Sequence, residues 1–496
     1  LHANGDTGEG PLARGPSALG RQCLEGMYLV VTLADRGAAA RDGSSGRIAP
    51  GGDIGYDFRN RLQRFPPLRR FANSALTTSH GLAEESRKVF MERFATARDA
   101  ALKLRPDVPV YCFRPHVLRE DAKNFKALFP GTTAYAVKTN GEPMVIRTLV
   151  EAGIDVFDVA SPAEFQTVRD ISPDAELLYM HPVKAQSDIR LALERYGIRV
   201  LVVDHEDEIA KILRIARALD IDHTTMTVFV RLATKGHAAY ELSKKFGAAP
   251  GHAVELLQRL HGIGFKTGLC FHVGSQVEEP DTYERALASA DWVRNRAAVP
   301  LAGLDVGGGF PAEYGHDPKS RAPKQPPLEE LMANLRGALE YWEFDDQPLV
   351  AEPGRVIVAR AFSLIVRVLL RKGRRLYIND GIWASLSDSW TGKITLPARF
   401  IPDPNIRRRN GDPEKIVPFK VCGATCDSVD ILTRPFYLPE TVDTGDWIEI
   451  GHIGAYSMAL RTRFNGFYPD SFVEVDQPFD AGDAPEGFAS LETMAD

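Results

Sequence analysis

The chain of 496 residues exceeds the length that one hydrophobic core usually supports, so we expect two folded domains. Its 60 basic and 66 acidic residues give a net charge of -6, and no basic cluster favours a nucleic-acid partner. No uncharged apolar run approaches the roughly 20 residues that cross a bilayer, which argues against a membrane protein. The composition therefore favours small-molecule chemistry.

The five cysteines are an odd number and lie far apart, without a CxxC pair or clustered histidines. This pattern argues against a disulfide framework and against a zinc site, so we expect no metal and a reducing, cytoplasmic location. The cysteines are Cys23, Cys112, Cys270, Cys422 and Cys426.

The two ends of the chain differ from its middle. Residues 1–80 are rich in Gly, Ala, Arg and Ser without sustained periodicity, which predicts a mostly disordered extension because little apolar surface can be buried. We expect residues 81–110 to be a lead-in segment that packs on a C-terminal β domain, and residues 481–496 to be a tail.

Short apolar runs alternate with helical stretches from about residue 105 to residue 355. The first run is VPVYCF, and eight more follow, most of them separated by intervals that suit an amphipathic helix. Such alternation favours parallel strands, and eight strand–helix units predict a closed (β/α)8 barrel, here over residues 111–355. The eight runs are TTAYAVK, IDVFDVA, ELLYMH, RVLVVD, MTVFVRL, LCFHVG, GLDVGGG and PLVAEPG.

Beyond residue 356 the alternation stops, and strand-like runs recur with turn signals between them. This pattern predicts an antiparallel β domain over residues 356–480, so the fold class is an α/β barrel followed by a β domain. The runs are AFSLIVRVLL, RRLYIND, IVPFKVCG, DWIEIG and SFVEVD.

Unusual residues stand at the C-terminal ends of the predicted barrel strands, where barrel enzymes carry their chemistry. Each has an ordinary structural explanation when taken alone, because strand-end lysines are commonly solvated, glycine runs are commonly turns and single histidines are commonly structural. Their occurrence in chain order at the same end of successive strands favours one shared site. The residues are Lys138, Asp158, Arg231, His272, Gly307–Gly309, Glu352 and Arg355.

These side chains suit a ligand with an aldehyde, a phosphate and a protonated ring nitrogen. Desolvation lowers the pKa of a lysine such as Lys138, which frees its amine to condense with an aldehyde. Consecutive glycines and Arg355 suit a phosphate, while Glu352 can hold a ring nitrogen protonated and His272 can stack on a flat ring. The combination describes pyridoxal 5'-phosphate.

Eight short motifs resemble those of the ornithine/diaminopimelate/arginine decarboxylase family, whose members use pyridoxal phosphate on an alanine-racemase-like barrel with a C-terminal β domain. The resemblance runs from about residue 105 to about residue 475 and leaves out the N-terminal extension. The motifs, in family order, are YAVKTN, FDVASPAE, LSKKFG, FHVGSQ, GGGFP, EPGR, CDSVD, and GAYS followed by FNGF.

The resemblance implies a role for each residue around the cofactor ring. Lys138 would bond covalently to the cofactor, Glu352 would pair with the pyridine nitrogen, and His272 would stack on the ring. Asp158 would support Lys138, and Arg231 would support Glu352. The implied phosphate-binding residues are Ser275, Gly307, Gly308, Gly309, Arg355 and Tyr456.

The resemblance also implies a head-to-tail homodimer in which each site is shared between the two subunits. Cys426 would enter the partner's site and protonate the product carbanion, and Asp427 would enter beside it. Phe464 and Asn465 would line the same junction. Cys270 and Cys422 are expected to be buried structural cysteines.

The motif CDSVD favours the ornithine/lysine branch, in which Asp427 would bind a distal ammonium group. Thr391 and Gly392 stand where that branch carries a Tyr-Asp pair, and Trp383 replaces its usual tyrosine. Asp388 could substitute for the missing aspartate if the loop is differently folded, although a solvated loop aspartate is the more ordinary explanation. We therefore expect decarboxylation of a basic amino acid of the ornithine or lysine type.

Three other functions stay open on the same scaffold. The substrate could be diaminopimelate, arginine, a D-amino acid or a carboxylated polyamine. The chain could also be a non-catalytic regulator of the antizyme-inhibitor type, although such proteins tend to lose cofactor residues. A racemase is disfavoured, because Cys426 stands in a decarboxylase-type motif.

Overall fold

The structure, a computed structural model, describes residues 91–234, 238–240, 245–315, 325–407 and 411–479. The extension predicted at residues 1–80, the first ten residues of the lead-in and the tail at residues 481–496 lie outside these ranges. Within the described ranges, every helix falls short of the length or apolar character that a bilayer-spanning segment requires.

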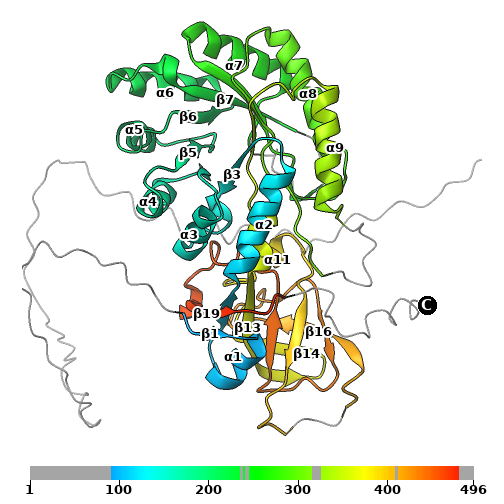
Figure 1. The fold of residues 1–496 in the computed structure, drawn as a ribbon. Helices are drawn as coiled ribbons and strands as arrows, with labels where there is room; N and C mark the ends of the chain where they lie inside the picture. The colour runs from blue at the N-terminus through cyan, green and yellow to red at the C-terminus, as the bar shows by residue number, and fades with distance from the viewer. Residues whose placement is uncertain (1–90, 235–237, 241–244, 316–324, 408–410, 480–496) are drawn as a thin grey trace, which may run out of the picture. The chain divides into compact units, whose positions relative to one another are not determined.

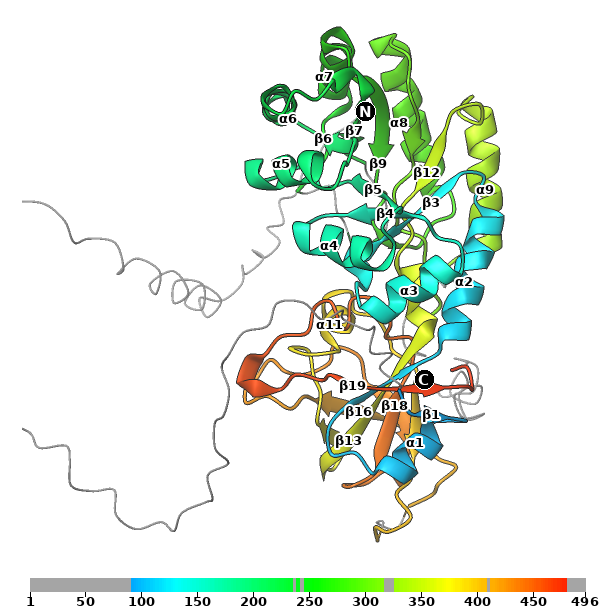
Figure 2. The same ribbon diagram turned by 60° about the vertical axis from the view of Figure 1, so that its left-hand side comes forward.

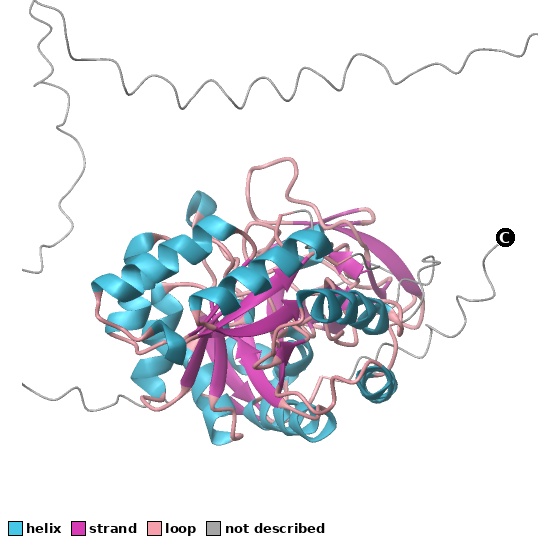
Figure 3. Ribbon diagram, turned by 90° about the horizontal axis from the view of Figure 1, so that it is seen from above, coloured by secondary structure: helices cyan, strands magenta, loops and turns pink. Residues whose placement is uncertain are grey.

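Eight parallel strands close into a barrel, in the ring order β11, β12, β3, β4, β5, β6, β7, β9. The eight strands coincide with the eight apolar runs, so the predicted barrel is confirmed, and Figure 3 shows its helices outside the strands. The strands are β3 (Thr132–Ala136), β4 (Val156–Val159), β5 (Glu176–Tyr179), β6 (Val200–Val203), β7 (Thr227–Leu232), β9 (Lys266–Phe271), β11 (Leu304–Asp305) and β12 (Leu349–Ala351).

The barrel helices each turn an apolar face toward the strands. Helix α6, for example, buries Ile209, Ile212 and Ala216, which recur at the helical period. Ser161 caps helix α4 by accepting a hydrogen bond from the backbone of Glu164. The helices are α2 (Pro115–Leu128), α3 (Pro143–Glu151), α4 (Pro162–Ile171), α5 (Gln186–Glu194), α6 (Glu206–Ala218), α7 (Pro250–Ile263), α8 (Thr282–Ala297) and α9 (Leu328–Tyr341), as labelled in Figure 1.

The second module is a nine-stranded sheet, several strands of which are labelled in Figure 2. Strand β13 is its longest member and pairs antiparallel with β2, β14 and β18. The strands are β1 (Arg93–Phe94), β2 (Val110–Phe113), β13 (Phe362–Lys372), β14 (Arg375–Ile378), β15 (Ala398–Ile401), β16 (Ile416–Cys422), β17 (Phe436–Pro439), β18 (Trp447–Ile450) and β19 (Ser471–Val475).

The remaining elements are short, apart from the eight-residue helix α1. Strands β8 and β10 pair with each other in a separate two-stranded sheet. These elements are α1 (Ala97–Leu104), β8 (Ala238–Tyr240), β10 (Ser275–Val277), α10 (Arg355–Val358), α11 (Ser387–Thr391), and the 3-10 turns η2 (Val137–Thr139), η3 (His223–Thr225), η4 (Ala359–Ala361) and η5 (Phe464–Gly466).

The sheet departs from the sequence prediction in two ways. Three of its pairings are parallel, namely β1 with β19, β19 with β2, and β14 with β16, so it is only mostly antiparallel. Strand β2 also joins this sheet rather than the barrel, although residue 111 was expected to begin the barrel. A four-residue buried apolar run looks the same in either setting, because periodicity alone does not identify its neighbours.

Two hydrogen bonds tie the sheet module to the end of barrel strand β3. Asn140 donates from Nδ2 to the carbonyl oxygen of Gly454 at 2.9 Å. The backbone N–H of Tyr456 donates to the carbonyl oxygen of Thr139, also at 2.9 Å. The segment that follows β18 is thereby fixed beside the lysine that ends the β3 run.

Candidate active site

The residues predicted for the site gather at the carboxyl ends of the barrel strands. Glu352 directly follows β12, Lys138 follows β3 in turn η2, and Asp158 lies in β4. These three strands are consecutive in the closed ring, so their ends meet at one rim of the barrel. Arg231 lies near the end of β7, and His272 directly follows β9.

Lys138 and Asp158 form an ion pair, with Nζ and Oδ2 separated by 2.6 Å. The lysine side chain is 40% exposed, whereas that of Asp158 is buried. Burial by itself would lower the pKa of the amine, but the negative charges of Asp158 and Glu352 outweigh it and raise that pKa. The expectation of a lowered Lys138 pKa is therefore wrong, because the strand ends also bring carboxylates to the amine.

Glu352 belongs to a group of three buried carboxyls with Asp158 and Asp305. Burial, and then the charges of Asp158 and Asp305, raise the pKa of Glu352 well above its usual range. The positive charges of Lys138 and Arg231 oppose that rise. Crowding of three buried carboxyls means that an added positive charge, such as a protonated ring nitrogen, would be stabilised beside them.

His272 reaches the site from the segment after β9. Its Nδ1 accepts a hydrogen bond from the backbone N–H of Gly274 at 3.2 Å. Burial, and then the positive charges of Arg231 and Lys138, lower the pKa of this imidazole well below its ordinary value. A neutral ring results, with no charge to oppose its packing on a flat ligand.

The three glycines after β11 lie too close to neighbouring backbone for any side chain. A Cβ at Gly307 would lie 2.1 Å from the carbonyl oxygen of Phe271, and one at Gly308 would lie 2.7 Å from that of Glu352. Gly307 and Gly309 also have positive φ angles of 67° and 109°. Glycine is therefore required here, and the bare backbone permits the close approach of an anion.

Arg355 is a buried guanidinium at the start of helix α10. Its Nε donates to Ser275 Oγ at 3.3 Å, and its Nη1 donates to the hydroxyl of Tyr314 at 2.8 Å. The guanidinium also lies 4.9 Å from the ring centroid of Tyr456. The structure thus brings the predicted phosphate residues Ser275, Arg355 and Tyr456 together.

Asp388 lies in the first turn of helix α11 and is largely buried. Both of its carboxylate oxygens accept hydrogen bonds from Arg355, Oδ2 from Nη1 at 2.6 Å and Oδ1 from Nη2 at 3.1 Å. This candidate for binding the substrate's distal ammonium is therefore already paired with Arg355, the arginine that was predicted to bind a phosphate.

A second group surrounds Trp383, whose indole Nε1 donates to Asp427 Oδ2 at 3.2 Å. Its ring also meets that of Phe464 edge-on, with centroids 5.9 Å apart. The exposed Cys426 donates from Sγ to Asn465 Oδ1 at 3.3 Å. The strand-end residues Lys138, Asp158, Arg231, His272 and Glu352 are called the Lys138 group below. In the described part of the chain, no hydrogen bond or ion pair joins the group around Trp383 directly to the Lys138 group.

Three residues around the Lys138 group went unnoticed in the sequence. Asp305 ends β11 and accepts a hydrogen bond from the N–H of Gly307 at 2.7 Å, and Tyr314 binds Arg355. Glu164 accepts a hydrogen bond from the N–H of Ala160 at 2.6 Å. An acidic residue in an otherwise apolar strand could have revealed Asp305, and Glu164 stands inside the motif FDVASPAE.

Pyridoxal phosphate fits this set of residues on three structural grounds. Lys138 offers an amine that is partly exposed, and the glycine backbone together with Arg355 offers an anion site. The buried carboxyls of Asp305 and Glu352 lie close enough to shift each other's pKa, and they offer acidic partners for a protonated ring nitrogen. Among the described residues, no group of three or more His, Cys, Asp or Glu side chains is placed to hold a metal ion.

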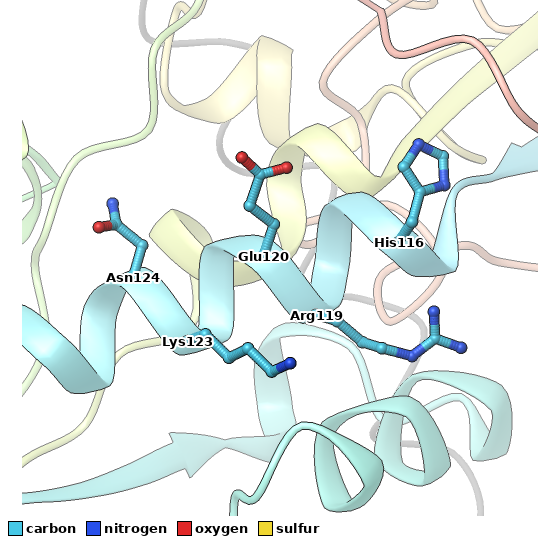
Figure 4. Close-up of a pocket in the computed structure, with 5 residues that line it drawn as sticks. All are labelled: His116, Arg119, Glu120, Lys123 and Asn124. Carbon is cyan, nitrogen blue, oxygen red and sulfur yellow. The ribbon is translucent and has the colours of Figure 1, made fainter.

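A separate surface depression lies on helix α2, and none of the predicted site residues lines it. Figure 4 shows that its lining side chains all project from this one helix. Arg119 pairs with Glu151 at 3.3 Å, an exposed ion pair of the kind that contributes little. We assign no function to it. The lining residues are His116, Arg119, Glu120, Lys123 and Asn124.

Comparison with known proteins gives concordant matches. Residues 116–359 match the family described as "Pyridoxal-dependent decarboxylase, pyridoxal binding domain". Ornithine decarboxylase of Mus musculus is 31% identical over 393 residues, which are 73% of this chain and 79% of that protein. Antizyme inhibitor 2 of Xenopus laevis is 30% identical over 375 residues, 71% of this chain and 77% of that protein.

Solved structures agree with the sequence matches. The crystal structure of lysine/ornithine decarboxylase from Vibrio vulnificus, complexed with putrescine, superposes with a TM-score of 0.63 at 29% identity. The match covers 76% of this chain and 97% of the Vibrio chain. The similarity therefore extends over both the barrel and the sheet module.

Proposed function

The chain belongs to the family of pyridoxal-dependent decarboxylases, and we propose that it removes the α-carboxyl group of a basic amino acid of the ornithine or lysine type. The products are then carbon dioxide and a diamine. The observation that carries this proposal is the Lys138–Asp158 ion pair, held beside the buried Glu352 at the ends of consecutive barrel strands.

Pyridoxal phosphate supplies an electron sink for the electrons that the departing carboxyl group leaves behind. In our proposal Lys138 holds the cofactor, and the carboxyl of Glu352 keeps a ring nitrogen positively charged. His272 packs against the ring as a neutral imidazole. Asp158 keeps the amine of Lys138 in place through the 2.6 Å contact.

The proton that replaces carbon dioxide comes, we propose, from the thiol of Cys426. Its exposure, and its place in a group with no direct bond to the Lys138 group in the described residues, support a role in the site of a second subunit. The active unit is then a homodimer in which each site contains residues of both chains. Four free cysteines in the described ranges, Cys426 among them, suit a reducing compartment, so we propose a cytoplasmic enzyme.

Preference for a basic substrate rests on Asp427. Its carboxylate is held by the indole of Trp383, and a fixed carboxylate suits a distal ammonium group. The decarboxylase from Vibrio vulnificus was solved with the diamine putrescine, which supports the same substrate class.

A non-catalytic regulator is the second candidate, because antizyme inhibitor 2 is 30% identical to this chain. The Lys138 group argues against it, since a regulator has no need of a lysine ion-paired beside a glycine-lined anion site.

Carbon dioxide release from a substrate panel tests the proposal. The panel contains ornithine, lysine, arginine, diaminopimelate, the D-isomers of ornithine and lysine, and a carboxylated polyamine. We expect the highest kcat/KM with L-ornithine or L-lysine. A protein that carries the cofactor and releases no carbon dioxide from any compound would contradict the proposal and favour the regulator.

A further inference from the structure

Arg355 and Asp388 form a two-point ion pair inside the proposed cofactor site. The Arg355 side chain is 3% exposed and that of Asp388 is 12% exposed, so water screens the pair weakly. Two parallel N–H···O contacts of 2.6 and 3.1 Å join Nη1 and Nη2 to the carboxylate. This is the geometry in which a guanidinium also grips a phosphate.

The other donors of Arg355 point to the same anion site. Nε binds Ser275 Oγ, and the second N–H of Nη1 binds the Tyr314 hydroxyl. A phosphate that accepted hydrogen bonds from both Nη1 and Nη2 would therefore occupy the edge of the guanidinium that the carboxylate of Asp388 now occupies. Two anions cannot share that edge without strong repulsion in a buried site.

Asp388 lies in the same segment as Trp383, so a movement of its carboxylate away from Arg355 can affect that tryptophan. Helix α11, which carries Asp388, has only five residues and follows Trp383 by a short loop in the same segment. Trp383 in turn holds Asp427 through its indole N–H. A shift of Asp388 would therefore move the segment that also carries the contact to the proposed substrate-binding aspartate.

We propose that Asp388 competes with the cofactor's phosphate for Arg355, so that tight cofactor binding requires this carboxylate to leave the guanidinium. The inference rests on the proposed function, since it assumes the phosphate of pyridoxal phosphate at Arg355. It gives Asp388 a regulatory task at the cofactor phosphate. The alternative is that Asp388 orients Arg355 for the phosphate. Removing the charge of Asp388 would tighten the binding of pyridoxal phosphate in the first case and weaken it in the second.

The test measures the dissociation constants of pyridoxal phosphate and of unphosphorylated pyridoxal for the cofactor-stripped full chain. Asp388→Asn keeps the size of the side chain and one acceptor oxygen, but it removes the charge and the second acceptor. We expect it to bind pyridoxal phosphate about tenfold more tightly than the wild type, because one charge-assisted contact no longer has to be broken. The affinity for pyridoxal should be unchanged.

Asp121→Asn is the matched control. Asp121 pairs with Arg360 at 3.0 Å and is also largely buried, but it lies on helix α2 outside the site. Its substitution should leave both dissociation constants unchanged. Asp388→Ser provides a second removal of the charge, and we expect it to tighten pyridoxal phosphate binding as well, which keeps the test valid should Asp388→Asn fail to fold.

Equal or weaker binding of pyridoxal phosphate by the folded Asp388 variants would overturn the competition and leave the proposed function intact. Equal tightening for pyridoxal and pyridoxal phosphate would also overturn it, because the effect would not involve the phosphate. A wild-type protein that binds neither compound would contradict the proposed function together with this inference.

Discussion

At the scale of single residues, the site is governed by three crowded, buried carboxyls. Asp158, Asp305 and Glu352 are all buried, and they face the cations Lys138 and Arg231. Burial first, and then the negative charge of Asp158, raise the pKa of Asp305 to about 7. The folded protein therefore holds a proton there that the unfolded chain releases near pH 4.

Asp305→Asn should change how stability depends on pH. The raised pKa means that the native wild type binds more protons than the unfolded chain between about pH 4 and about pH 7, so this group's contribution to stability is lost as the pH rises through that window. The asparagine variant lacks this loss. Its free energy of unfolding should therefore become larger relative to that of the wild type, so that the variant is relatively more stable, as the pH rises from about 4 to about 7.

Urea unfolding at several pH values measures the difference in the free energy of unfolding between the wild type and Asp305→Asn. A difference that stays constant between about pH 4 and about pH 7, or that changes in the opposite direction, would show that Asp305 is ionised in the folded protein throughout this range.

Most residues of the Lys138 group could be predicted from the sequence, because parallel strands deliver their C-terminal residues to one rim. The Arg355–Asp388 pair could not, since it joins a barrel-end helix to a loop of the sheet module 33 residues later. The raised pKa of Lys138 was missed for a similar reason. It depends on Asp158 and Glu352, which other strands bring to the amine.

At the scale of elements, the buried Asp430 ties together the loops that carry Trp383 and Cys426. Its Oδ1 accepts a hydrogen bond from the N–H of Ile382 at 2.9 Å. Its Oδ2 accepts two more from the backbone N–H and the hydroxyl of Thr425, at 3.0 and 2.6 Å. One carboxylate thus holds the two proposed substrate-facing segments together.

Asp430→Ala should release these two loops from each other. Loss of the buried acceptor leaves donors unsatisfied, and we expect a destabilisation of about 1–3 kcal/mol. Decarboxylation should fall about tenfold or more because Cys426 and Trp383 lose their fixed positions. Cofactor binding should be retained, since the Lys138 group lies on other elements.

Asp222→Ala is a control, because Asp222 accepts comparable hydrogen bonds from the N–H and hydroxyl of Thr224 in turn η3. It should affect stability without affecting turnover. Normal turnover in a folded Asp430→Ala protein would contradict the proposed role of these loops.

The elements that could be predicted are those with a strong sequence signal. Barrel strands are buried on both faces and therefore appear as continuous apolar runs. Strands β15 and β17 were missed because β15 (ARFI) contains an arginine and β17 (FYLP) ends in a proline, and each has only four residues. The pairing partners of β2 could not be predicted, since they come from residues more than 200 positions later.

At the scale of the whole molecule, exposed aromatic side chains accompany the group around Cys426. Phe464 is 44% exposed and Phe467 is 43% exposed, and both line one hollow with Trp383 and Thr425. Large exposed aromatics close to a proposed catalytic thiol favour a surface that a second copy of the chain covers. This is the surface on which we place the subunit contact.

Mixing two inactive variants tests whether the sites are shared between subunits. Lys138→Ala and Cys426→Ala should each have little activity alone. If each site takes its lysine from one chain and its cysteine from the other, random re-association restores one intact site in every mixed dimer. About one quarter of the wild-type activity should then return. A mixture that stays at the mean of the two variants would contradict shared sites.

The central claim is that Lys138 bonds covalently to pyridoxal phosphate. The most direct measurement is borohydride reduction of the cofactor-loaded protein, followed by peptide mapping by mass spectrometry. Our account predicts a pyridoxyl phosphate group on Lys138 and on no other lysine, and none at this position in Lys138→Arg. A group fixed to a different lysine, or a wild-type protein that carries none, would contradict it.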